Sequence, residues 1–283
     1  MKLSAITDEI SQDFEHALDV MQEYGVRAAE LRGLWGTNIG ELDAAQVAQA
    51  KQALKERDMV VSCLATPFFK CELEEDTATV AGRMHLAKAR RLSEQMDLLR
   101  RCCDLAHQFG TDLIRVFTFW RRGELTPEIE ARIVESFAEP IAIAKEEGVT
   151  LVLENEHACY IGTGAEAARI LAALNSPQVR ACWDPGNALC AGETPYPDGY
   201  NAIRSYVAHV HVKDAVFDPE SGREKWCVIG EGLIDYHNQF EALRCDGYTG
   251  YISLETHYVP QGGTPEDGSR PCLAALRRFL PDG

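Results

Sequence analysis

The stretch VTLVLE, residues 149–154, is a short apolar run that ends in a glutamate. Three later runs have the same form, because each carries a polar group of the metal-ligand type at or near its end. They are VRACWD at 179–184, YVAHVHV at 206–212 and GYISLE at 250–255. Near-continuous apolar runs of this length are typical of parallel strands that are buried on both faces. If the four strands belong to one sheet, their terminal groups meet at one edge.

Runs of this kind occur eight times along the 283 residues. The predicted strands are 2–6, 26–31, 59–65, 112–117, 149–154, 179–184, 206–212 and 250–255. Helical patterns separate them, as parallel strands require. Eight alternations predict an α/β fold, the (β/α)8 TIM barrel, as a single domain over residues 1–283. An open, doubly wound sheet is the alternative, but no GxGxxG or GxxxxGK[ST] motif follows a strand.

Three helices can be placed from their patterns and boundaries. Ser11 is the expected N-cap of the first helix. A long helix is expected over about 79–108, and another from Pro127 to about Glu147. Glycines that close helices in a left-handed conformation are expected at Gly25, Gly110 and Gly148.

Composition limits the possible partners. Lys and Arg total 28 against 44 Asp and Glu, which gives a formal net charge of −16. Such a surface repels phosphate backbones and anionic lipid, so we expect no nucleic-acid partner. The start, MKLSAITDEIS, meets an acidic residue before an apolar signal segment forms, and no run approaches the roughly 20 apolar residues of a membrane span. A cytoplasmic protein with no membrane partner is expected.

Ten cysteines are scattered along the chain without a CxxC pair. Cys102 and Cys103 are adjacent in a predicted helix, and Cys63 and Cys182 lie in predicted strands. This spacing favours neither a disulfide framework nor a zinc cluster. We expect mostly reduced thiols that act as small buried hydrophobic groups.

Equivalent places on four predicted strands carry Glu154, Asp184, His211 and Glu255. In a barrel they would meet at one rim and present three carboxylates and one imidazole. That donor set suits a hard or borderline divalent cation. His209 shares a face of its strand with His211 but lies farther from the strand end. We therefore expect His209 to be a hydrogen-bonded core residue.

Long segments rich in Gly, Pro and Asp follow the last three strands, at 185–199, 213–234 and 256–270. Loops after the strands build the active site of such a barrel. The lengths of these segments therefore indicate which face carries the site.

Motifs near these strand ends resemble those of the xylose isomerase-like TIM barrels. This superfamily comprises sugar phosphate isomerases and epimerases, ketose 3-epimerases, inosose dehydratases and endonuclease IV-type proteins. The resemblance covers nearly the whole chain and rests on LENEH, WDPGN, HVHVKD, GEGLIDY and GYISLE in this order. It implies one divalent metal ion, most often Mn²⁺, with Mg²⁺, Co²⁺ or Zn²⁺ as alternatives, held by Glu154, Asp184, His211 and Glu255. It also implies that Glu154 and Glu255 move the proton, and that homo-oligomers are common.

One position departs from the family pattern. Many members have a His three residues after the sixth-strand Asp, where it grips substrate oxygens, whereas WDPGN places Asn187 there. An amide can hydrogen-bond a hydroxyl but cannot act as an acid or base near neutral pH. Glu156 and His157 are candidates to replace the missing imidazole in substrate binding. The alternative is that they form a solvent-exposed loop pair.

Two further residues are candidates for substrate binding. Trp120 follows the fourth strand and either walls a pocket or caps the core. Lys213 follows the seventh strand and either holds a substrate oxygen or a carboxylate, or forms a strand-end ion pair with Asp214 or Glu231.

Proton transfer beside a carbonyl is the chemistry that this site predicts. A cation that chelates a sugar carbonyl and the adjacent hydroxyl would stabilise the enediolate formed when the neighbouring carbon loses its proton. Glu154 and Glu255, on opposite sides, could remove a proton from one face and return one to the other. The sequence thus predicts a divalent-metal-dependent sugar isomerase or epimerase acting on a keto-sugar or polyol derivative.

Other functions on the same scaffold stay open. A lyase or dehydratase, acting on an inosose, 3-dehydroshikimate or a 3-oxo-glycoside, would expel a leaving group from the same enolate. An endonuclease IV-like abasic-site nuclease would need more metal ligands and a basic groove, and the −16 charge argues against it. A non-catalytic sugar-binding barrel would bind metal without proton exchange.

Overall fold

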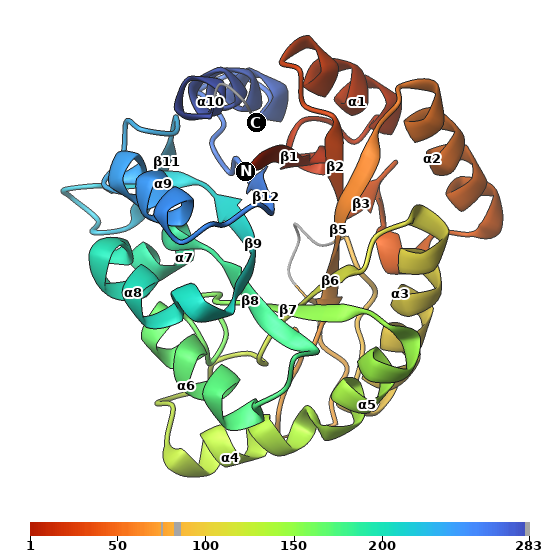
Figure 1. Cartoon of the computed structure of the whole chain (residues 1–283), viewed down its shortest axis with the longest axis vertical. Helices are drawn as coiled ribbons and strands as arrows, with labels where there is room; N and C mark the ends of the chain where they lie inside the picture. The colour runs from red at the N-terminus through yellow and green to blue at the C-terminus, as the bar shows by residue number, and fades with distance from the viewer. Residues whose placement is uncertain (75, 82–85, 281–283) are drawn as a thin grey trace.

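Eight parallel strands form a closed barrel in this computed structural model, with helices outside it (Figure 1). The structure describes residues 1–74, 76–81 and 86–280. Around the barrel the order is β1 (Lys2–Ile6), β12 (Tyr251–Leu254), β9 (Val207–Val212), β8 (Val179–Trp183), β7 (Thr150–Glu154), β6 (Leu113–Val116), β5 (Val60–Phe68) and β2 (Ala28–Leu31). Each of these eight barrel strands overlaps a predicted one. The predicted (β/α)8 barrel is confirmed.

Alternation along the strands separates two environments. In β7, Leu151 and Leu153 belong to the large apolar core between the barrel and its helices. Val152 packs instead with Cys63 and Cys182 in a small cluster. Because successive side chains point to opposite faces, Glu154 shares the face of Val152. The same rule that buries the core therefore directs Glu154 into the barrel.

Ten α-helices are present in the described part of the chain. They are α1 (Phe14–Glu23), α2 (Ala44–Glu56), α3 (Gln95–Phe109), α4 (Pro127–Ser136), α5 (Ala138–Glu147), α6 (Gly164–Leu174), α7 (Pro185–Cys190), α8 (Tyr200–Ile203), α9 (Tyr236–Cys245) and α10 (Pro265–Phe279). The expected left-handed glycines are confirmed, with φ of 70° at Gly25, 71° at Gly110 and 69° at Gly148.

The predicted N-cap of the first helix is wrong by two residues. The side chain of Asp13 accepts a hydrogen bond from the His16 N–H and caps α1. The Ser11 hydroxyl accepts instead from the Asp13 N–H, in the turn before the helix. Both residues favour helix starts, and the one next to the first helical residue provides the cap.

The helix predicted over 79–108 is confirmed only in its second half, as α3. Residues 82–85 lie outside the described residues. Before α3, Thr79 and Arg90 form an antiparallel bridge, and Arg90 makes an ion pair with Glu41. Asp76 accepts hydrogen bonds from the main chain and the hydroxyl of Ser93. These contacts between distant residues outweigh the local helical pattern.

The helix predicted from Pro127 to Glu147 is divided into α4 and α5, which meet at Phe137. Pro140 lies in the first turn of α5. It has no N–H to donate to the carbonyl four residues earlier, so a continuous helix would lose a hydrogen bond there and suffer a steric clash. The break follows from that proline.

Two of the long segments after the last strands contain elements of their own. Residues 185–199 begin with α7, and 213–234 contain an antiparallel hairpin of β10 (Asp214–Phe217) and β11 (Glu224–Cys227). A second small hairpin, β3 (Gly33–Leu34) with β4 (Thr37–Asn38), follows β2. Both hairpins follow barrel strands, on the side where the site is expected.

Two expectations from composition can be compared with the structure. The ten cysteines, all within the described residues, are free thiols, and seven are buried. This agrees with the prediction of reduced, mostly buried cysteines. Among the helices of the described residues, none has the length and apolar character that a membrane crossing requires.

A close approach of α10 to the loop after β12 generates a test of packing. A Cβ added to Gly268 would lie 1.8 Å from the carbonyl oxygen of Tyr258. We expect Gly268→Ala to lower the free energy of unfolding by about 1–3 kcal/mol in urea titrations, because the backbone must shift. Gly123→Ala is the control, since its Cβ would meet no described atom within 4 Å. Equal midpoints for the two variants would contradict this account.

Candidate functional site

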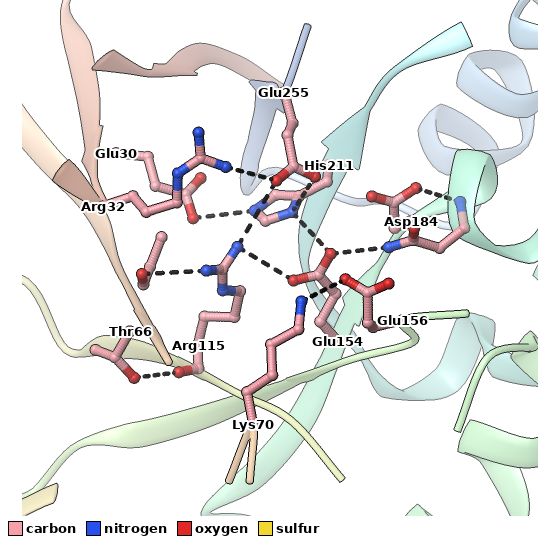
Figure 2. Close-up of polar contacts among 12 residues, drawn as sticks. Glu30, Arg32, Thr66, Lys70, Arg115, Glu154, Glu156, Asp184, His211 and Glu255 are labelled. Carbon is pink, nitrogen blue, oxygen red and sulfur yellow. Dashed lines mark hydrogen bonds and ion pairs between the residues drawn. The ribbon is translucent and has the colours of Figure 1, made fainter. Parts of the chain in front are cut away.

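The four predicted metal ligands lie together at the carboxyl ends of adjacent strands (Figure 2). Glu154 ends β7, Asp184 follows β8, His211 is in β9 and Glu255 follows β12. One ligand atom from each lies within 4.8 Å of the others. Their exposed fractions are 4% or less. The structure therefore brings together three carboxylates and one imidazole in a space nearly closed to solvent.

The donor set fits a divalent cation. Among the described residues, Glu154 Oε2, Asp184 Oδ2 and His211 Nδ1 are buried atoms that make no hydrogen bond. The two oxygens are engaged in ion pairs, with Arg115 and Lys213 respectively. His211 Nδ1 lies 3.5 Å from Glu154 Oε1 and 3.6 Å from Glu255 Oε2. Carboxylate oxygen and imidazole nitrogen are the ligands that Mn²⁺ and related ions accept in proteins. These atoms have the chemistry and the proximity to bind one such ion.

Positive side chains balance the carboxylates in this structure. Arg115, from β6, places a guanidinium nitrogen 3.2 Å from Glu154 Oε2. Lys213, which follows β9, places Nζ 2.8 Å from Asp184 Oδ2 and 2.5 Å from Glu255 Oε2. Each of these side chains is at most 5% exposed. A buried carboxylate without such a partner would be strongly disfavoured.

A third cationic side chain, that of Arg32, contacts the Glu255 oxygen that Lys213 does not contact. Arg32 follows β2 and donates to Glu255 Oε1 at 3.1 Å. It also donates to Asp8 at 3.0 Å and to Glu9 at 2.6 Å. Its side chain is 1% exposed. Arg32 thus fixes the orientation of Glu255 from a network of buried ion pairs.

Glu30, in β2, lies behind the histidines. His211 donates from Nε2 to Glu30 Oε1 at 3.0 Å, and His209 donates from Nε2 to Glu30 Oε2 at 2.8 Å. All three side chains are fully buried. A carboxylate on the far nitrogen directs the other ring nitrogen of His211 toward the carboxylates. The expectation that His209 is a hydrogen-bonded core residue is confirmed.

Asn155 holds the backbone of Asp184. Its side chain donates to the Asp184 carbonyl at 2.8 Å and accepts from the Asp184 N–H at 2.9 Å. Asn155 is fully buried. The Asp184 side chain also caps α7 by accepting from the Asn187 N–H at 2.8 Å. Asp184 is therefore restrained from both sides.

Burial raises the pKa of each carboxyl group of the site, whereas the neighbouring cations lower it. Burial raises the pKa of Asp184 above its ordinary value, although Lys213 opposes this effect. Burial also acts on Glu154, but Arg115 and His211 together overcome it and the pKa is lowered. For Glu255, Lys213 is the main group that overcomes burial and holds the pKa well below its usual range. Both glutamates are thus ionised at neutral pH, as a general base must be.

Glu156, His157 and Asn187 form one connected group beside the ligands. The Glu156 side chain is 13% exposed, and its carboxylate accepts from Lys70 Nζ at 2.8 Å. His157 is half-buried, and its Nδ1 lies 3.0 Å from Asn187 Oδ1. Asn187 Nδ2 donates to Glu154 Oε1 at 3.0 Å. The alternative of a solvent-exposed loop pair is wrong for Glu156.

Lys213 does not pair with Asp214 or Glu231, so that alternative is wrong. The Asp214 carboxylate accepts from the backbone N–H groups of Gly230 at 2.8 Å and Gly232 at 3.0 Å. It therefore organises the loop after the β10–β11 hairpin. Lys213 points the other way, toward the candidate ligands (Asp184 and Glu255) described above.

Trp120 is half-buried and lines a cavity of about 350 Å³ together with Tyr160 and Arg122. Lys70 Nζ lies 5.3 Å from the centroid of its ring. None of the four candidate metal ligands lines this cavity, so substrate binding by Trp120 stays a prediction.

Several residues of the site were missed from the sequence: Asp8, Glu9, Glu30, Arg32, Lys70 and Arg115. A signal was available for two of them. Glu30 in VRAAEL and Arg115 in DLIRVF are charged residues inside apolar runs. A charge at such a position is rarely buried without a partner, so both indicate an interior ion pair.

The family model described as xylose isomerase-like TIM barrel matches residues 18–279. The chain belongs to this family. The resemblance seen in the motifs is thereby confirmed.

Inosose dehydratases are among the curated relatives. The enzyme from Clostridium perfringens (strain ATCC 13124) is 26% identical over 258 residues, which cover 83% of this chain and 82% of the relative. The enzyme from Lacticaseibacillus casei is 25% identical over 135 residues, which cover 43% of this chain and 45% of the relative. The chain therefore matches less than half the length of that second enzyme.

Solved structures of low sequence identity share the fold. The probable 3-DHS dehydratase AsbF from Bacillus anthracis has a TM-score of 0.75 and 17% identity, with 98% of each chain covered. The D-allulose 3-epimerase from Methylomonas sp., in complex with D-allulose, has a TM-score of 0.71 and 17% identity, with 99% of this chain and 97% of that chain covered. At this identity the likeness concerns the fold alone.

Cation binding by the quartet can be tested through stability. We expect Mn²⁺ to raise the free energy of unfolding of protein dialysed against EDTA, by about 2.7 kcal/mol at a concentration of 100 times Kd. Asp184→Asn should abolish most of this gain, because it replaces a charged ligand by a neutral amide. Urea titrations with and without Mn²⁺ measure both.

The matched control is Asp58→Asn, whose side chain is fully exposed. This variant should keep the full stabilisation by Mn²⁺. Equal stabilisation of the Asp184 variant and the wild type would show that the ion binds elsewhere.

Proposed function

We propose that this protein is a divalent-metal-dependent sugar isomerase or epimerase that acts on a neutral keto-sugar or polyol derivative. One observation carries the proposal. Glu154 and Glu255 are ionised, nearly buried carboxylates that flank one point, since each has an oxygen within 3.6 Å of His211 Nδ1. Two bases around one point are what proton transfer between two faces of a carbon requires.

The quartet of Glu154, Asp184, His211 and Glu255 would hold the ion, which would polarise a substrate carbonyl and so acidify the neighbouring carbon. Glu154 removes or returns the proton on one face, and Glu255 acts on the other. Arg115 keeps Glu154 ionised, and Lys213 does the same for Glu255. Near-exclusion of water strengthens each of these electrostatic effects.

Charge balance supports a neutral substrate. The cations that border the quartet in the described part of the chain are already ion-paired with carboxylates. They are Arg32, Lys70, Arg115 and Lys213. A phosphate or carboxylate group on the substrate would have to compete with these buried pairs, whereas hydroxyl groups can hydrogen-bond to them. A keto-sugar or cyclic polyol ketone meets this condition.

Solvent exchange tests the two glutamates. Ketohexoses, inososes and 3-oxo-glycosides are first screened by NMR in D₂O with Mn²⁺ and wild-type protein. For the substrate found, we expect Glu154→Gln and Glu255→Gln each to lose net isomerisation or epimerisation and to slow deuterium incorporation by at least about 100-fold, because an amide cannot accept the proton.

Metal loss is controlled in the same experiment by measuring bound Mn²⁺ in each variant at saturation. Glu139→Gln, on the exposed surface of α5, is the matched control and should exchange at the wild-type rate. A glutamine variant at 154 or 255 that retains the ion and full exchange would exclude that residue as a base.

A second candidate is a dehydratase. The ammonium of Lys213 contacts both Asp184 and Glu255, so a donor of positive charge lies where a leaving hydroxyl could be stabilised. The 26% identity to an inosose dehydratase over 83% of the chain also supports it. Product analysis distinguishes the two: loss of water from an inosose favours the dehydratase, and exchange without net loss favours the epimerase.

A further inference from the structure

A chain of hydrogen bonds connects the buried base Glu154 to a residue at the surface. Asn187 Nδ2 donates to Glu154 Oε1 at 3.0 Å. The other side of the same amide, Asn187 Oδ1, lies 3.0 Å from His157 Nδ1. Asn187 is 1% exposed, whereas the His157 side chain is 36% exposed. His157 is therefore the outer end of a three-residue connection to the quartet.

The neighbours of His157 determine which atom carries the hydrogen. Its Nδ1 lies between two oxygens, Asn187 Oδ1 at 3.0 Å and Glu156 Oε1 at 3.2 Å. An amide carbonyl oxygen and an ionised carboxylate only accept hydrogen bonds. Lys70 Nζ donates to the other oxygen of this carboxylate, Glu156 Oε2, at 2.8 Å and balances its charge. His157 Nδ1 must therefore donate.

The amide of Asn187 is then locked at both ends. Its NH₂ faces the Glu154 carboxylate, and its oxygen faces the His157 N–H. Rotation of the amide by half a turn would place oxygen against oxygen at Glu154 and N–H against NH₂ at His157. Both contacts would be repulsive, so His157 selects the one orientation in which Asn187 can bond to Glu154.

Asn187 also contacts a second ligand. Its backbone N–H donates to Asp184 Oδ1 at 2.8 Å. One residue thus connects Glu154 and Asp184, through its side chain and its main chain respectively. A loss of orientation at Asn187 would loosen the carboxylate of Glu154 while leaving the main-chain bond to Asp184 in place.

We propose that His157 is a positioning residue: through the Asn187 amide it fixes the orientation of the Glu154 carboxylate. The inference rests on the proposed function for the role of Glu154 as ligand and base. The contact itself is independent of any substrate.

A double-mutant cycle on Mn²⁺ binding tests the proposal. We expect His157→Ala to weaken Mn²⁺ binding about tenfold in calorimetry, as loss of a residue that orients a metal ligand does. Asn187→Ala should weaken it at least as much. The double variant should bind like Asn187→Ala alone, because His157 acts only through the amide. An undiminished effect of His157→Ala in the Asn187→Ala background would overturn the proposal, as would no effect in the wild type.

A second measurement needs neither metal nor substrate. The side-chain NH₂ signals of Asn187, assigned by their loss in Asn187→Asp, should shift in ¹⁵N-labelled His157→Ala. His237→Ala, an exposed imidazole on α9, is the control and should leave them unchanged. Failure of the wild type to bind Mn²⁺ would refute the proposed function, and the NMR result would then decide the positioning role alone. Unchanged Asn187 signals in His157→Ala would refute the positioning role of His157.

Discussion

Compensation of buried negative charge is the constraint on which the rest of this structure depends. Ionised carboxylates resist removal from water unless each has a cation or hydrogen-bond donors close by. Here Glu154 has Arg115, and Glu255 has Arg32 and Lys213. The four ligand-type residues come from β7, β8, β9 and β12, which are contiguous, whereas both arginines come from the opposite half of the barrel. Closure of the sheet is what brings the two halves within reach.

The barrel also supplies residues behind the candidate ligands that fix the orientation of the ligands. Glu30 reaches across from β2 to both histidines of β9, and its carboxylate uses one oxygen for each ring. Because His209 and His211 are two residues apart, the pleat presents both to the same partner. The orientation of the His211 imidazole is thus determined by strand alternation and by one carboxylate on a strand far away in the sequence. The donor geometry results from the fold and not from mobile loops.

Much of this arrangement can be predicted from the sequence. The apolar runs that end in Glu154, Asp184 and Glu255 place three carboxylates at equivalent strand ends, and strand ends of a barrel share one rim. Arg32 escapes prediction, because its pairing depends on which strands face one another across the axis. For Glu30 the sequence indicates an interior charge but not the histidines that it contacts. The segment before α3 was mispredicted for a similar reason, since Arg90 is held by distant Glu41. The break between α4 and α5, in contrast, could have been read from Pro140.

The two hydrogen bonds between the Asn155 side chain and the Asp184 main chain affect the rigidity of the site. The side-chain amide bonds to both the N–H and the carbonyl of Asp184, as the backbone of a neighbouring strand would. It adds one more rung to the ladder between β7 and β8, beyond the last residue of β8. The carboxylate of Asp184 therefore inherits the stiffness of the barrel although a long connection begins at the next residue.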